Sequence, residues 1–117
     1  SYVPYSHFRV GAVLVTKDGK EYTGCNFENA SFPATVCAER TAFAKAISEG
    51  EREFACIAIV GGREGEISPF CAPCGVCRQV MSEFCGSDFE VVLGTPDKFK
   101  VFKFDEVLPM RFTGDEL

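Results

Sequence analysis

The chain lacks the features that mark membrane proteins, secreted proteins and nucleic-acid-binding proteins. No apolar run approaches the roughly 18 to 20 residues that a membrane span requires, and residues 1–5 lack the basic and apolar regions of a signal peptide. The net charge is −5, and the basic residues are scattered between Arg9 and Arg111 instead of forming a stripe. We therefore expect a cytoplasmic protein that binds a small molecule and contacts neither membrane nor nucleic acid.

Tryptophan is also absent, but the overall composition is that of a folded domain. The 117 residues are 46% hydrophobic and 25% charged, and they include 12 phenylalanines. A chain of this length buries roughly 60–70% of its unfolded surface, which is enough for one core. Because the sequence has no linker or repeat, we expect a single catalytic domain over residues 1–117. Because it also has no basic groove, we expect that the phenylalanines form no stacking platform for single-stranded nucleic acid.

Apolar and β-branched runs predict five strands, over residues 8–15, 21–25, 54–60, 89–94 and 99–104. The first two form a hairpin, because Asp18-Gly19 between them is a strong turn signal. The third is a continuous apolar run of the kind found in strands covered on both faces, and Gly61-Gly62 is expected to end it.

Two helices are predicted, over residues 37–49 and 74–85. The first is rich in strong helix formers and is followed by Gly50, and the second begins after Pro73 and is followed by Gly86. The order of hairpin, helix, strand, helix and two strands predicts an α/β three-layer sandwich, in which a mixed five-stranded sheet is covered by helices.

The seven cysteines are an odd number in a chain without a secretion signal, which disfavours a complete disulfide framework. Three of them occur in two short patterns, Cys37-Ala38-Glu39-Arg40 and Pro73-Cys74-Gly75-Val76-Cys77-Arg78-Gln79. A Cys-x-x-Cys turn at a helix start directs both sulfurs to one point, where free backbone N–H groups stabilise thiolates. These patterns predict one Zn²⁺ per chain, bound by Cys37, Cys74 and Cys77.

Only three ligands are evident, and a zinc ion with three protein ligands keeps its fourth position for water, as catalytic zinc sites do. Zinc lowers the pKa of its water from about 15.7 to about 7 in the best-studied case, but three thiolates oppose this effect. A nearby cation should offset their charge. Arg40 and Arg78 are the available arginines, and we favour Arg40.

Glu39 is two positions from Cys37 at the same helix start. It can therefore hydrogen-bond the metal-bound water without binding the metal, and we predict that it is the general acid and base. Cys-x-Glu followed by Pro-Cys-x-x-Cys matches the zinc deaminase signature, in which activated water attacks C4 of cytosine.

With these motifs, the chain closely resembles the small homotetrameric cytidine deaminases. The resemblance extends to two further segments, residues 5–12 (Tyr-Ser-His-Phe-Arg-Val-Gly-Ala) and residues 24–31 (Gly-Cys-Asn-Phe-Glu-Asn-Ala-Ser). Two departures stand out. The helix that precedes residue 5 in the family has no counterpart here, and Phe32-Pro33 occupies a stretch where relatives commonly have a tyrosine.

The resemblance implies roles for further residues. Asn26 and Glu28 would hydrogen-bond the ribose hydroxyls, Phe8 would pack against the nucleoside, and the backbone of Ala38 would hold the base edge together with Glu39. It also places Gln79, like Arg40, close behind the metal ligands, and it presents Phe112 to a neighbouring subunit of a homotetramer.

The activity implied is zinc-dependent hydrolysis of cytidine and 2′-deoxycytidine to uridine and 2′-deoxyuridine with release of ammonia, in pyrimidine salvage. One alternative is the same chemistry on another cytosine-containing substrate, such as an antibiotic or a polynucleotide base. Another is a zinc-stabilised module without turnover, whose structural zinc would take His7 or Cys71 as its fourth ligand. Otherwise we expect His7 to have no special role and Cys71, Cys25, Cys56 and Cys85 to be buried.

Overall fold

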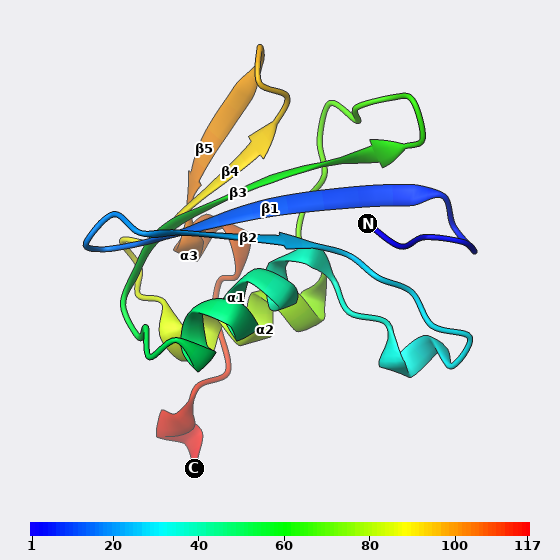
Figure 1. Cartoon of the computed structure of the whole chain (residues 1–117). Helices are drawn as coiled ribbons and strands as arrows, with labels where there is room; N and C mark the ends of the chain where they lie inside the picture. Colours follow the sequence, from blue (N-terminus) through cyan, green and yellow to red (C-terminus); the bar gives the residue numbers. More distant parts are fainter.

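The strands form one mixed sheet in the order β2-β1-β3-β4-β5 (Figure 1). The computed structural model describes all of residues 1–117. Strands β3 and β4 are parallel, and the other neighbouring pairs are antiparallel. The predicted hairpin and mixed five-stranded sheet are therefore confirmed. The strands are β1 (Phe8–Thr16), β2 (Glu21–Cys25), β3 (Phe54–Arg63), β4 (Glu90–Gly94) and β5 (Phe99–Lys103).

Strand β3 continues through Gly61 and Gly62, so the prediction that these glycines end it is wrong. They pair with Val10 and Arg9 of β1. Their lack of side chains admits a returning loop, because a Cβ on Gly61 would lie 2.7 Å from Cys71 Sγ and one on Gly62 would overlap the following loop. The two glycines extend the strand and let the chain fold back tightly over its end.

The two predicted helices are present as α1 (Ala38–Ser48) and α2 (Gly75–Phe84). Each is one residue shorter at both ends than predicted, because Cys37 and Cys74 are N-caps with extended backbone. A short helix, α3 (Phe104–Val107), follows β5 and was not predicted, since four residues carry too little periodicity. None of these helices combines the length and the apolar character needed to cross a bilayer.

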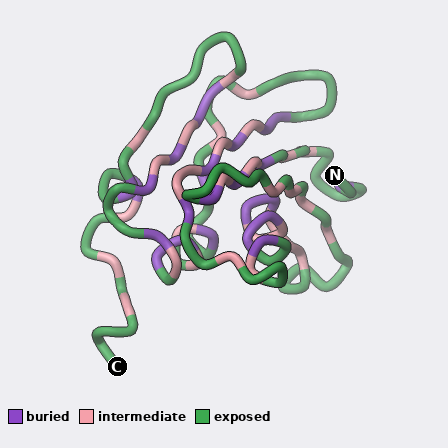
Figure 2. Tube along the Cα trace, turned by 60° about the vertical axis from the view of Figure 1, so that its left-hand side comes forward, coloured by how far each residue is buried: buried purple, intermediate pink, exposed green.

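The helices pack against one face of the sheet. Seventeen buried residues from strands and helices form a single core cluster, in which Phe43, Phe89 and Phe104 are almost fully enclosed. The side chains of β1 alternate accordingly, with Ala12 and Leu14 buried under α1. On the opposite face the residues of β1, β3 and β4 are half-buried or exposed except Gly62 and Gly94. Figure 2 shows buried and half-buried positions alternating along the strands. The predicted α/β fold, a mixed five-stranded sheet covered by helices, is thus confirmed.

Helix α1 lies unusually close to β2. A Cβ on Gly24 would lie 2.6 Å from Ala42 N and would overlap the Ala38 carbonyl oxygen. The start of α1, which carries Cys37 and Glu39, can approach the sheet only because residue 24 has no side chain.

We expect Gly24→Ala to push α1 away from β2 and to lower the free energy of unfolding by about 1–3 kcal/mol. Urea denaturation followed by circular dichroism measures this change. Gly11→Ala is the matched control on the neighbouring strand, since a Cβ there meets nothing within 4 Å. Equal stabilities of the two variants would contradict the close approach.

Candidate active site and metal centre

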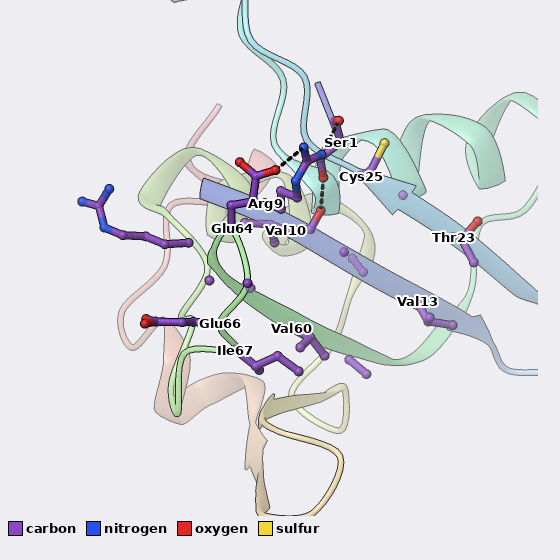
Figure 3. Close-up of a pocket in the computed structure, with 18 residues that line it drawn as sticks. Ser1, Arg9, Val10, Val13, Thr23, Cys25, Val60, Glu64, Glu66 and Ile67 are labelled. Atoms are coloured by element: carbon purple, nitrogen blue, oxygen red, sulfur yellow. Dashed lines mark hydrogen bonds and ion pairs between the residues drawn. The ribbon is translucent and has the colours of Figure 1, made fainter. Parts of the chain in front are cut away.

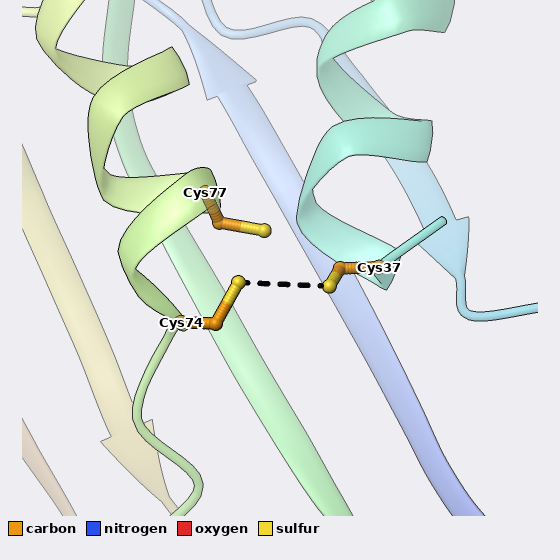
Figure 4. A group of neighbouring side chains, drawn as sticks. All are labelled: Cys37, Cys74 and Cys77. Carbon is orange, nitrogen blue, oxygen red and sulfur yellow. Dashed lines mark hydrogen bonds between the residues drawn. The ribbon is translucent and has the colours of Figure 1, made fainter. Parts of the chain in front are cut away.

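The three cysteines of the two short motifs meet where α1 and α2 begin (Figure 4). Cys37 and Cys74 cap the two helices, and Cys77 lies in the first turn of α2. Their sulfur atoms all lie within 4.8 Å of one another, and Cys37 Sγ is 3.7 Å from Cys74 Sγ. Zinc–sulfur bonds of about 2.3 Å at a tetrahedral angle separate two sulfurs by about 3.8 Å, so the geometry fits a zinc ion.

Proton sharing among the thiols favours deprotonation of one of them. Hydrogen bonding with Cys77, supported by Arg40 and Cys74, lowers the pKa of Cys37 to about 5. The same bond to Cys37, together with burial, raises the pKa of Cys77. The cluster therefore already favours thiolate at Cys37, which is the form that binds a metal.

Arg40 lies beside this cluster. Its Nη2 is 3.6 Å from Cys37 Sγ and donates to the Thr35 carbonyl at 3.3 Å, while its buried Nε has no hydrogen-bond partner. Hydrogen bonding to Cys37 is the main cause that raises the pKa of Arg40, so the guanidinium stays charged. A cation thus lies where thiolate charge must be balanced.

Glu39 follows in the first turn of α1 and is only 4% exposed. Burial raises the pKa of its carboxyl group, and the nearby Cys37 adds to the effect. The adjoining Ala38 is fully buried. The structure therefore places a carboxyl group with restricted access to water beside three candidate metal ligands.

Glu28 lies on a separate cavity of about 440 Å³, which it lines with Tyr5, Ser6, Asn29, Phe32 and Thr35. Its carboxylate accepts hydrogen bonds from the backbone N–H groups of Tyr5 and Ser6, at 3.0 and 3.1 Å, and from the Ser6 hydroxyl. The Ser6 hydroxyl is the main cause that lowers the pKa of Glu28. Sequence reasoning gave Ser6 no role. The signal available in the sequence was the small polar residue Ser6 directly before His7. In the structure, the backbone of His7 has a positive φ of 59°.

Asn26 is bound to the backbone of β1. Its Oδ1 accepts from Val10 N at 2.9 Å, and its Nδ2 donates to the Phe8 carbonyl at 2.9 Å. The side-chain amide therefore anchors the half-buried Phe8 at the start of β1. Any bond from Asn26 to a ligand would use the second lone pair of Oδ1 or the second N–H of Nδ2.

Gln79 and Phe112 lie away from the sulfurs and contact each other. Gln79 Nε2 donates to the Phe112 carbonyl at 2.9 Å, and the Phe112 ring is largely exposed. The Gln79 amide thus binds the C-terminal segment and makes no hydrogen bond to a sulfur, so its place behind the metal ligands stays a prediction.

The remaining cysteines and the histidine lie outside the three-sulfur cluster. Cys71 is half-buried, as is Cys56, whereas Cys85 is buried and its burial raises its pKa to about 12. Cys25 is exposed, contrary to expectation, because it ends the edge strand β2 with its side chain on the uncovered sheet face. His7 is exposed.

A larger cavity, of about 620 Å³, lies on the uncovered face of β1, β2 and β3 (Figure 3). Arg9 crosses its rim, donating to the Ser1 carbonyl at 2.9 Å and pairing with Glu64 at 3.7 Å. Its lining contains none of the clustered cysteines and does not include Glu39. Cavity size therefore does not identify the reactive site in this molecule.

An α/β fold that brings Cys-x-Glu and Pro-Cys-x-x-Cys to one point defines the class of zinc-dependent nucleobase deaminases. The family model described as "Cytidine and deoxycytidylate deaminase zinc-binding region" matches residues 1–95, and the chain belongs to this family.

Proteins similar to this chain agree with that assignment. The cytidine deaminase of Sporosarcina psychrophila is 46% identical over 121 residues, which cover 100% of this chain and 84% of that protein. The cytidine deaminase of Halalkalibacterium halodurans is 46% identical over 118 residues, covering 100% and 86%. The crystal structure of cytidine deaminase from Burkholderia pseudomallei superimposes with a TM-score of 0.84 at 49% identity, covering 95% of this chain and 87% of that one.

We expect the purified protein to contain one zinc per chain, and Cys77→Ser to lose most of it, because a buried ligand of the cluster is removed. Atomic absorption measures the zinc. Cys71→Ser is the matched control and should retain one zinc per chain, since Cys71 lies outside the cluster. Zinc loss from Cys71→Ser would instead support a closed structural site with four thiol ligands.

Proposed function

We propose that the chain catalyses zinc-dependent hydrolysis of cytidine and 2′-deoxycytidine to uridine and 2′-deoxyuridine, with release of ammonia, in pyrimidine salvage. The observation that carries this proposal is the position of buried Glu39 beside Cys37, Cys74 and Cys77 at the meeting of two helix starts. The similar proteins with 46% and 49% identity over nearly the whole chain are named cytidine deaminases, which supports this substrate class.

Cys37, Cys74 and Cys77 would hold the zinc ion, which would supply a Lewis acid that lowers the pKa of a water molecule and makes it a nucleophile. Glu39 accepts a proton from that water and delivers it to N3 of the ring, while the water oxygen bonds to C4. Glu39 then takes the second proton from the new hydroxyl group on C4 and delivers it to the amino nitrogen, so that the C4 carbonyl forms, the bond from C4 to this nitrogen breaks and ammonia leaves. The backbone of Ala38 holds the base edge, so that the proton paths stay short.

Arg40 balances part of the charge of the three thiolates. Its contact with Cys37 Sγ and its unpartnered buried Nε support this role. Without that cation, the sulfur ligands would donate more charge and weaken the activation of water.

The cavity around Glu28 favours a nucleoside over a nucleotide. None of its six lining residues is lysine or arginine, and Glu28 adds a negative charge. A carboxylate accepts hydrogen bonds from ribose hydroxyls but repels a phosphate group. Asn26 assists by fixing Phe8, which packs against the nucleoside.

Glu39→Gln should lower kcat/KM for cytidine by about 10²–10⁴-fold while zinc content and fold are retained, because an amide cannot carry protons. The fall in ultraviolet absorbance on deamination measures the rate. Glu49→Gln, at the exposed end of the same helix, is the matched control and should keep full activity. Zinc-loaded protein without turnover of any cytosine compound would establish the non-catalytic module.

The same assay separates the substrates. Free cytosine and 2′-deoxycytidylate should react at least tenfold more slowly than cytidine, because cytosine lacks the ribose hydroxyls that would bind Glu28 and the phosphate is repelled. Preferred turnover of a cytosine-containing antibiotic or of a polynucleotide would replace the nucleoside in this proposal.

The working unit in this proposal is a cytoplasmic homotetramer in which Phe112 of one chain reaches the site of another. Large exposed aromatic side chains, including Phe32 and Phe112, support an interface. Seven free cysteines fit a reducing compartment. Sedimentation velocity at assay concentration should give the mass of four chains, whereas an active monomer would exclude this arrangement.

A further inference from the structure

Arg78 connects the metal-binding turn to a segment near the C-terminus. Its Nε donates to the Pro73 carbonyl at 2.8 Å, and its Nη1 donates to the Val107 carbonyl at 2.6 Å. Pro73 is buried and directly precedes Cys74, while Val107 is the last residue of α3. One half-buried guanidinium thus binds both segments.

The bond to Pro73 closes the turn that carries two of the three sulfurs. The backbone N–H of Arg78 also donates to the Cys74 carbonyl, at 3.0 Å. Residue 78 therefore binds the turn through its backbone and its side chain, with Cys74 and Cys77 between the bonded groups. Such charge-assisted bonds to carbonyls restrict the positions of both sulfurs.

The bond to Val107 ties this turn to the core. The side chains of Phe104 and Val107 are buried in the main cluster, so packing in the core holds α3 in place. Beyond α3 the chain runs along α2 to residue 112, and Arg111 Nη1 donates to the Cys85 carbonyl at the other end of that helix, at 2.9 Å. The segment is thus fastened to both ends of α2 by arginine–carbonyl bonds.

These contacts distinguish Arg78 from Arg40. The sequence offered both as cations that could balance thiolate charge and favoured Arg40, and the side-chain hydrogen bonds of Arg78 indeed go to two carbonyls and none to a sulfur. We propose that Arg78 is a positioning residue, which holds the Pro73–Cys77 turn against α3 and so keeps Cys74 and Cys77 at zinc-binding distance. The inference rests on the zinc-binding part of the proposed function and is independent of the substrate.

Zinc release from the loaded protein tests this inference without any substrate. We expect Arg78→Ala to release zinc to an excess of a coloured chelator at least tenfold faster than the wild type, well below the melting temperature. Arg78→Lys should give an intermediate rate, because an ammonium group cannot span both carbonyls as the planar guanidinium group of arginine does. The cobalt-substituted Arg78→Lys protein should also show an altered thiolate-to-metal charge-transfer band.

Arg111→Ala is the matched control, since it removes an arginine–carbonyl bond between the same segment and the far end of α2. It should lower thermal stability and leave the rate of zinc release and the cobalt spectrum unchanged. Wild-type release rates in both Arg78 variants, or equal acceleration in Arg111→Ala, would overturn the positioning role. If Arg78→Ala does not fold, the rate and spectrum of Arg78→Lys decide the question.

Discussion

The approach of two helix N-termini to a single point is the constraint on which the rest of this molecule depends. Each terminus carries unpaired backbone N–H groups and a partial positive charge, and both stabilise thiolate. Cys37 and Cys74 occupy the cap positions themselves, so their sulfurs lie where this effect is greatest. The metal site therefore depends on the positions of the two helix N-termini as much as on the cysteines.

Different contacts hold the two helix N-termini in place. Helix α1 is set by contact with β2, where Gly24 leaves room for the backbone at Ala38. Helix α2 is set by polar bonds to the segment after β5, with Arg78 near its start. A shift of either helix would change sulfur separations that a metal ion tolerates only within about 0.2 Å.

The carboxyl groups of Glu39 and Glu28 lie in two different surroundings. Glu39 is buried beside the sulfurs, and in the proposed reaction its restricted access to water would favour controlled proton transfer. Glu28 lies on an open cavity and is held by Ser6, so it stays ionised and available to hydroxyl groups. The same residue type is thus suited to the two roles proposed above, because burial raises the pKa of one carboxyl group and hydrogen bonds lower that of the other.

Local patterns in the sequence were enough to predict the five strands, the two main helices and the three thiols, because these depend on local periodicity, caps and motif spacing. They also singled out Glu39 and Arg40, which follow the ligand Cys37 by two and three positions. Contacts in the folded chain were needed to show that Gly61 and Gly62 continue a strand, that Gln79 binds the C-terminal segment, and that Arg78 binds carbonyls and not sulfur. These outcomes depend on contacts between residues up to 53 positions apart, as in the pairing of Arg9 with Gly62. Local sequence carries no signal for such contacts, since they join residues that are distant in the chain.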